Sequence, residues 1–143
     1  MPSIHIPRIT REIHLSDYQP EYVDEQGNPV TLHIWVNPPR SVMDGWRDIQ
    51  RGWIELVAEG QKSPSDDETI LEARGNRVIE LNHRLCDWFA QVWSQKPGAE
   101  TWTQEEVNNL IAHFSDSDPM AWDWIRDKTL EAIRQYRELK RKN

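Results

Sequence analysis

Cysteine and glycine are scarce in this chain of 143 residues, which contains one cysteine and six glycines. The lone Cys86 excludes an internal disulfide and is typical of a protein kept in a reducing compartment. With so few glycines, the chain has no glycine-rich loop that could bind phosphates. The hydrolase signature G-x-S-x-G and the metalloprotease signature H-E-x-x-H are also absent. We therefore expect no enzyme activity and no cofactor.

Long hydrophobic runs are missing as well, since no stretch of the sequence approaches the roughly 20 apolar residues of a membrane span. The first residues, MPSIH, lack the charged-then-apolar order of a secretory signal. We expect a protein of the cytoplasm that does not associate with membranes.

Basic residues are too few for generic nucleic-acid binding, because the net charge is -7. The charge is uneven: residues 126–143 hold seven basic and three acidic side chains, or +4, which leaves -11 elsewhere. The basic end is explained by a solvated helix terminus, although contact with nucleic acid or with an acidic partner stays open.

Tryptophan dominates the aromatic residues, with eight against two phenylalanines and three tyrosines. Each indole offers a large apolar surface and one N–H donor, which suits helix packing and protein contacts. We expect more indole surface than this small fold can bury. The composition therefore favours a protein that contacts other polypeptides, or copies of itself.

The first part of the chain, residues 1–37, predicts a β-hairpin. Apolar residues between Ile9 and Leu15 indicate one strand, and alternation from Val30 to Val36 indicates a second. Between them, residues 24–28 are turn formers, in which Gly27 can adopt a positive φ.

Residues 38–143 predict four amphipathic helices. Their expected starts are an Asn37 N-cap followed by two prolines, a capping box of Ser65 with Glu68, a second of Thr103 with Glu106, and Asp118-Pro119. The first helix should end near Gly60 and the second before Pro97. The predicted fold is α+β and predominantly α, as a single domain spanning residues 1–143.

Two tryptophans stand away from the predicted core stripes. Trp124 lies opposite the Ile125 to Tyr136 stripe of the last helix, so it packs under the hairpin or a loop, or it binds a partner. Trp35 faces away from Leu32 and Ile34, so the hairpin is covered on both faces or has one docking face. We predict interaction anchors at four residues: Trp35, Trp124, Tyr18 and Tyr22.

Metal binding and carboxylate catalysis both have simpler explanations. His83 and Cys86 form half of a metal site at helical spacing, but the sequence supplies no matching half-site, and only the fold could recruit His113, Asp116 or Asp118. The acidic run at residues 66–68 fits helix capping and the helix dipole. We expect no metal.

The order of these segments resembles the tail assembly chaperones of long-tailed bacteriophages and prophages. The resemblance rests on three segments: ITREIHLSDY at residues 9–18, IWVNPP at residues 34–39 before a helix, and Trp93 before a loop with TWTQEE at residues 101–106. It covers most of the chain.

The resemblance implies a mostly helical, non-enzymatic protein that coats the tape measure protein and recruits tail tube subunits. Such chaperones often have a longer form made by ribosomal frameshifting. Two other readings stay open: a small acidic adaptor or inhibitor that binds a basic protein, and an enzyme with an unfamiliar site around His83, Cys86 and His113.

Overall fold

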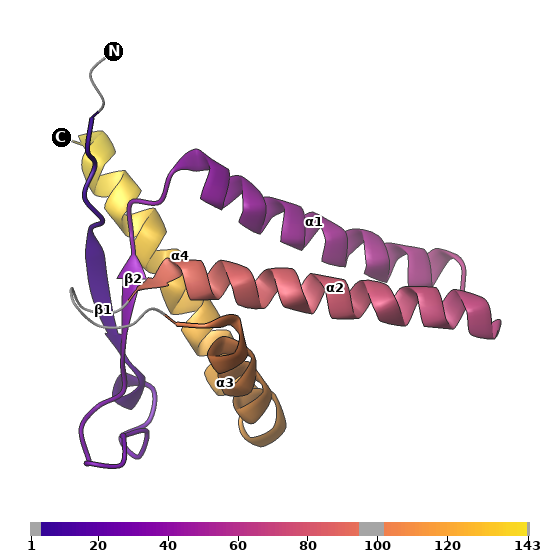
Figure 1. Ribbon diagram of the computed structural model, residues 1–143, viewed down its shortest axis with the longest axis horizontal. Helices are drawn as coiled ribbons and strands as arrows, with labels where there is room; N and C mark the ends of the chain where they lie inside the picture. The colour runs from indigo at the N-terminus through magenta and orange to yellow at the C-terminus, as the bar shows by residue number, and fades with distance from the viewer. Residues whose placement is uncertain (1–3, 95–101, 143) are drawn as a thin grey trace. The chain divides into compact units, whose positions relative to one another are not determined.

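A computed structural model describes residues 4–94 and 102–142, and it confirms a mainly helical α+β fold with an N-terminal hairpin (Figure 1). Its elements in chain order are β1 (Thr10–His14), a 3-10 turn (Leu15–Asp17), β2 (Thr31–Trp35), α1 (Arg40–Lys62), α2 (Glu68–Val92), β3 (Trp93–Ser94), α3 (Gln104–Ser117) and α4 (Pro119–Lys142). None of these helices is both long enough and apolar enough to cross a membrane.

The chain forms two compact units. The first contains Met1–Pro38 together with Ala90–Asn143, and the second is Pro39–Phe89. The first unit therefore holds the sheet with α3 and α4, and the second holds α1 with most of α2. A single domain over residues 1–143 stays a prediction.

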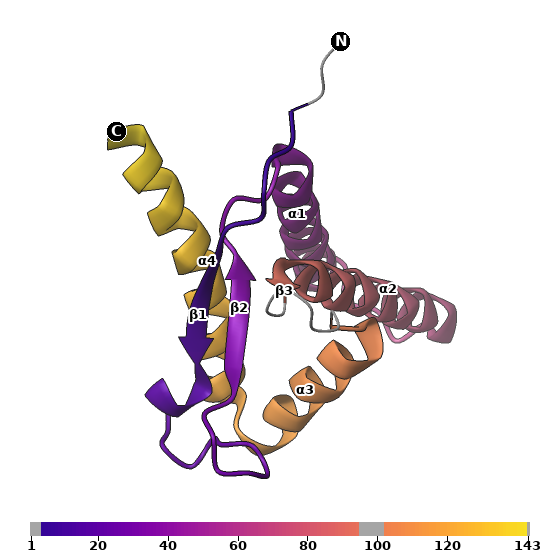
Figure 2. The ribbon, with the colours of Figure 1, turned by 60° about the vertical axis from the view of Figure 1, so that its left-hand side comes forward.

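The sheet of the first unit has three strands in the order β1-β2-β3. β1 and β2 are antiparallel, with Thr10 opposite Trp35 and His14 opposite Thr31 (Figure 2). Gly27 in the connecting loop has φ 79°, as its place in the predicted turn requires. β3 follows α2 directly and pairs antiparallel with β2, placing Trp93 opposite Ile34. The sequence did not predict this third strand.

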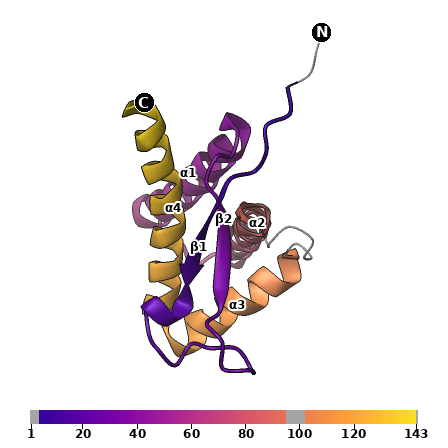
Figure 3. The same cartoon turned by 90° about the vertical axis from the view of Figure 1, so that its left-hand side faces the viewer.

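One face of the sheet is buried under α4, which runs along the hairpin strands (Figure 3). Alternate residues of β2 confirm the period-two pattern, since Leu32 and Ile34 are fully buried while Thr31, His33 and Trp35 are half-buried. The indole N–H of Trp93 donates to Thr129 Oγ1 at 3.2 Å, and the Thr129 hydroxyl donates to the Ile125 carbonyl at 2.8 Å, so both buried polar groups are hydrogen-bonded.

The helix caps agree with the sequence at two starts and correct it at two others. Thr103 and Glu106 form the predicted capping box, and Asp118 Oδ1 accepts from the Ala121 N–H at 3.3 Å. The predicted Ser65 capping box is wrong, because Asp67 accepts from the N–H groups of Thr69 and Ile70. The predicted Asn37 cap is also wrong, since Pro39 occupies the N-cap position.

α1 and α2 of the second unit form an antiparallel helical hairpin. Trp46 contacts both Trp88 and Phe89, with ring centroids 4.9 and 5.8 Å away, and the Trp88 indole N–H donates to the Val42 carbonyl at 2.7 Å. Gly52 lies against Leu81, where the two helices approach closely. Tryptophan thus forms part of the core of both units.

Candidate protein-interaction surfaces

Three of the four predicted anchors lie together in the first unit, around the carboxylate of Asp118. Tyr18 donates to Asp118 Oδ1 at 3.3 Å, and Tyr22 donates to Oδ2 at 2.8 Å. The ring of Tyr18 lies 5.6 Å from that of Trp124, and the ring of Tyr22 lies 5.5 Å from that of Phe114. The carboxylate therefore joins the loop after β1 to the junction of α3 and α4.

The electrostatics of this cluster keep both phenols protonated. The hydrogen bond to Asp118, followed by burial, raises the pKa of Tyr22 from 10.0 to about 12. Burial, followed by the negative charge of Asp118, raises the pKa of Tyr18. Both tyrosines thus act as neutral hydrogen-bond donors that hold the loop in place. Trp124 is half-buried and packs against Tyr18, in agreement with the predicted alternative that it packs under the hairpin or a loop. A role in partner contact stays a prediction for Tyr18, Tyr22 and Trp124.

Trp35, the fourth predicted anchor, lies on the opposite face of the sheet from the core. The Arg8 guanidinium covers its ring at 3.8 Å from the ring centroid. On the same face, Glu12 carboxylate oxygens lie 3.7 Å from His14 Nε2 and 3.9 Å from His33 Nδ1. This face is polar and partly covered by its own side chains, and the docking role of Trp35 stays a prediction.

The apolar side chains that face solvent are aliphatic. All eight tryptophans lie in the described residues, and each is buried or half-buried. In the second unit, five aliphatic side chains are exposed by 41 to 69%: Ile54, Val57, Ile70, Leu71 and Ile79. Periodicity alone did not single them out, because they lie beside the stripes that form the contact between α1 and α2.

Four of these side chains share one side of the helical hairpin. A helix turns by about 100° per residue, so Ile54 and Val57 lie roughly 60 to 120° around α1 from its packed stripe. On α2, Leu71 and Ile79 are displaced from the packed stripe of that helix in the same rotational sense. Because the helices are antiparallel, displacement in the same sense places residues on the same side of the pair.

The opposite side of the hairpin is charged. There, Arg77 lies 3.8 Å from Glu55, and Arg74 lies 3.9 Å from Glu59. We define the uncharged face as the nine residues on the aliphatic side: Gln50, Ile54, Val57, Gln61, Leu71, Gly75, Val78, Ile79 and Asn82. None of these nine carries a charge, although 29% of the chain is charged. The exposed Glu68, in the first turn of α2, borders this face at its end. Gly75 lies between Leu71 and Ile79, and its backbone is open to close approach.

The residues considered for metal binding lie on two units. His83 and Cys86 are on α2, with Cys86 buried, whereas His113 is on α3 and is exposed. Burial, followed by the charge of Asp87, raises the pKa of the Cys86 thiol. Residues 4–94 and 102–142 contain no group of three or more histidine, cysteine or acidic side chains that could hold a metal ion.

The acidic run at residues 66–68 lies at the start of α2, where Asp67 caps the helix.

The chain was compared with protein-family models, with curated proteins and with solved structures, and none of them matches it.

Proposed function

We propose that this protein is a non-enzymatic assembly chaperone that holds a client polypeptide against the uncharged face of the α1–α2 hairpin. The observation that carries the proposal is the exposure of Ile54 by 69%, Val57 by 55%, Leu71 by 49% and Ile79 by 56% on one side of two long helices. Contiguous apolar surface on a polar protein is typical of a contact site for another polypeptide.

The shape of this face favours a helical client. An amphipathic helix packs its apolar side against such a surface with anchors at helical spacing. Gly75 presents no side chain on this face and permits close approach of the client backbone. The charged side, with its Glu55–Arg77 and Glu59–Arg74 pairs, keeps the complex in water.

The resemblance to phage tail assembly chaperones supplies the identity of the proposed client. In that role the uncharged face covers the tape measure protein, and tail tube subunits join afterwards. A face built of aliphatic side chains without charge suits a transient cover, because it makes no fixed ion pairs that the tube subunits would have to break.

The test is co-expression with the tape measure protein of the same phage or prophage, followed by size-exclusion chromatography with mass measurement. We expect the two proteins to elute as one complex. The double variant Val57→Asp/Ile79→Asp should weaken the complex by about a hundredfold or more, because each carboxylate would be buried without a partner.

Asn76→Asp is the matched control, since it adds a carboxylate at an exposed position of α2 outside the uncharged face. It should leave the complex intact, and circular dichroism should show equal helix content in all variants. Elution of the wild-type chain apart from the tape measure protein would refute the chaperone role. Equal weakening by Asn76→Asp would refute the assignment to the uncharged face.

A further inference from the structure

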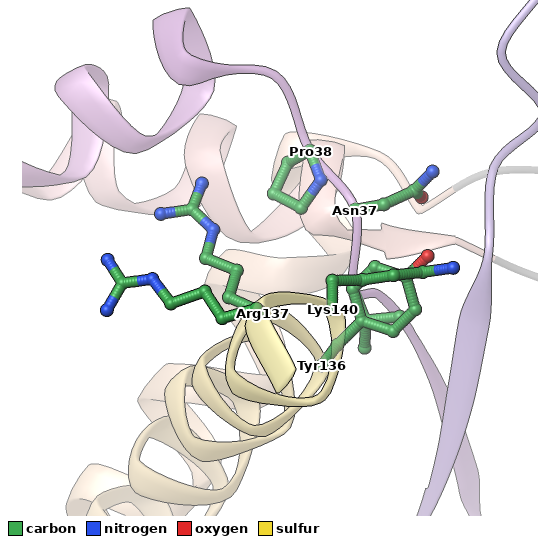
Figure 4. Close-up of a pocket in the computed structure, with 7 residues that line it drawn as sticks. Asn37, Pro38, Tyr136, Arg137 and Lys140 are labelled. Atoms are coloured by element: carbon green, nitrogen blue, oxygen red, sulfur yellow. The ribbon is translucent and has the colours of Figure 1, made fainter. Parts of the chain in front are cut away.

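A pocket of about 450 Å³ lies in the first unit, where the end of β2 meets the last turns of α4. Val36, Asn37 and Pro38 line it from the strand side, and four residues line it from the helix: Tyr136, Arg137, Lys140 and Arg141. Figure 4 shows Tyr136, Arg137 and Lys140 at the end of α4, with Asn37 and Pro38 on the strand side of the pocket. The residues on both sides belong to the same compact unit.

The charge of this pocket is entirely positive. Its lining includes Arg137, Lys140 and Arg141 and no acidic side chain. Eight arginines elsewhere form ion pairs with carboxylates: Arg40, Arg47, Arg51, Arg74, Arg77, Arg84, Arg126 and Arg134. Among the described residues, the three pocket cations have no carboxylate partner. Glu138, on the same turns of α4, pairs instead with Arg134 at 3.0 Å.

The helix dipole alone explains basic residues at the end of α4, but it does not explain the apolar surface beside them. Val36 and Pro38 are buried behind the pocket, and Tyr136, which is half-buried with its ring 5.7 Å from Lys140 Nζ, offers apolar surface within it. Lysine and arginine stems add further apolar surface. The pocket therefore combines an apolar floor with a cationic rim.

The strand-side wall is fixed by Asn37. Its side-chain Oδ1 accepts from the Ile9 N–H at 2.8 Å, and its Nδ2 donates to the Pro7 carbonyl at 3.0 Å. The same segment also bonds to the residue before Asn37, since the Val36 N–H donates to the Ile9 carbonyl at 2.9 Å. The Asn37 amide thus holds the wall in place, and recognition of a ligand falls to the three cations.

We propose that this pocket binds an acidic peptide segment of a partner protein. One aliphatic side chain of the segment rests on Tyr136 and on the apolar stems of the neighbouring cations, while its carboxylates pair with Arg137, Lys140 and Arg141. Arginine binds a carboxylate through two parallel hydrogen bonds, which gives the rim directional contacts. The proposal is independent of the uncharged face and of the chaperone role.

The observations favour an acidic peptide over nucleic acid. A nucleic-acid chain is held by many phosphate contacts along an extended basic surface, and its affinity comes from the neutralisation of many charges. Here three cations surround one pocket on a chain whose net charge is -7. A phosphate gains no free energy from contact with an apolar floor, whereas a leucine or isoleucine side chain is stabilised by burying its surface there.

The test uses the full chain and a fluorescein-labelled octapeptide of alternating leucine and glutamate, with binding followed by fluorescence anisotropy at low salt. We expect saturable binding. Arg137→Glu and Lys140→Glu should each weaken it about tenfold, because an attraction becomes a repulsion. An octapeptide of alternating glycine and glutamate should also bind roughly tenfold more weakly, since it leaves the apolar floor unused.

Lys62→Glu is the matched control, because Lys62 also lies in the last turn of a long helix, is exposed and undergoes the same change of charge. It should leave binding unchanged. The proposal is overturned if the leucine–glutamate peptide fails to bind or if Lys62→Glu weakens binding as much as Lys140→Glu does. It is also overturned if the glycine–glutamate peptide binds equally well. Tighter, pocket-dependent binding of a labelled oligodeoxythymidine would assign the pocket to nucleic acid instead.

Discussion

The variant Gly52→Ala should destabilise the α1–α2 hairpin, although alanine favours a helix more than glycine does. In a helix interior, alanine is more stable than glycine by about 1 kcal/mol. At position 52, however, the new Cβ would lie 2.6 Å from Leu81 Cδ2 and 3.6 Å from Leu81 Cδ1. Leu81 is only 2% exposed, so it cannot swing into solvent. Overpacking of this kind costs about 1–3 kcal/mol, and we expect a net loss of about 1 kcal/mol.

Gly60→Ala on the same helix is the control, because a Cβ at Gly60 would meet no atom within 4 Å. It should stabilise the protein by about 1 kcal/mol, so the two variants should differ by about 2 kcal/mol in free energy of unfolding. Urea denaturation followed by far-UV circular dichroism measures both. In a Leu81→Ala background, Gly52→Ala should become stabilising. Equal stabilisation of the wild-type chain by Gly52→Ala and Gly60→Ala would contradict a close contact between position 52 and Leu81.

Two further predictions concern the first unit. A tyrosine whose pKa is raised on folding adds stability that is complete below pH 10.0 and is lost as the pH rises toward about 12. Asp118→Asn should therefore lower the pKa of Tyr22 toward 10.0 in an ultraviolet titration and should reduce the loss of stability over that range; an unchanged titration curve would contradict the assigned role of Asp118. Thr129→Val should lower the free energy of unfolding by about 1–3 kcal/mol, because the buried Trp93 N–H loses its acceptor, whereas Thr129→Ser, which keeps the hydroxyl, should cost less. Equal denaturation midpoints for these two variants would show that the hydrogen bond contributes little.

The features that the sequence predicts correctly depend on local interactions. The capping box of Thr103 and Glu106 closes within one helical turn, and the turn at Gly27 needs only one residue of positive φ. The alternation along β2 shows which side chains are buried because one face of the strand meets α4. Such patterns can be detected in a single sequence, since all the residues that form them lie close together in the chain.

The features that the sequence missed depend on residues far apart in the chain. Asn37 has the residue type and position of an N-cap, but its amide bonds instead to Pro7 and Ile9, about 30 residues earlier. β3 has two residues and no strand pattern of its own, and it exists because Trp93 reaches Ile34. The Asp118 cluster likewise joins residues about 100 positions apart, so the grouping of Tyr18, Tyr22 and Trp124 could not be seen in the sequence.

The distribution of tryptophan changes where partner contact is expected. Large indole surface suggested exposed tryptophan anchors, yet Trp46, Trp88 and Trp93 are buried and the other five are half-buried. Trp88 and Trp93 each gain apolar contact and an N–H acceptor from their own chain, at Val42 and Thr129, whereas Trp35 Nε1 is buried without an acceptor among the described residues. Aliphatic side chains have no donor to satisfy, so they can face water without leaving a polar atom unpaired. This difference is consistent with isoleucine, leucine and valine on the proposed client-binding face, and with tryptophans that pack within each unit.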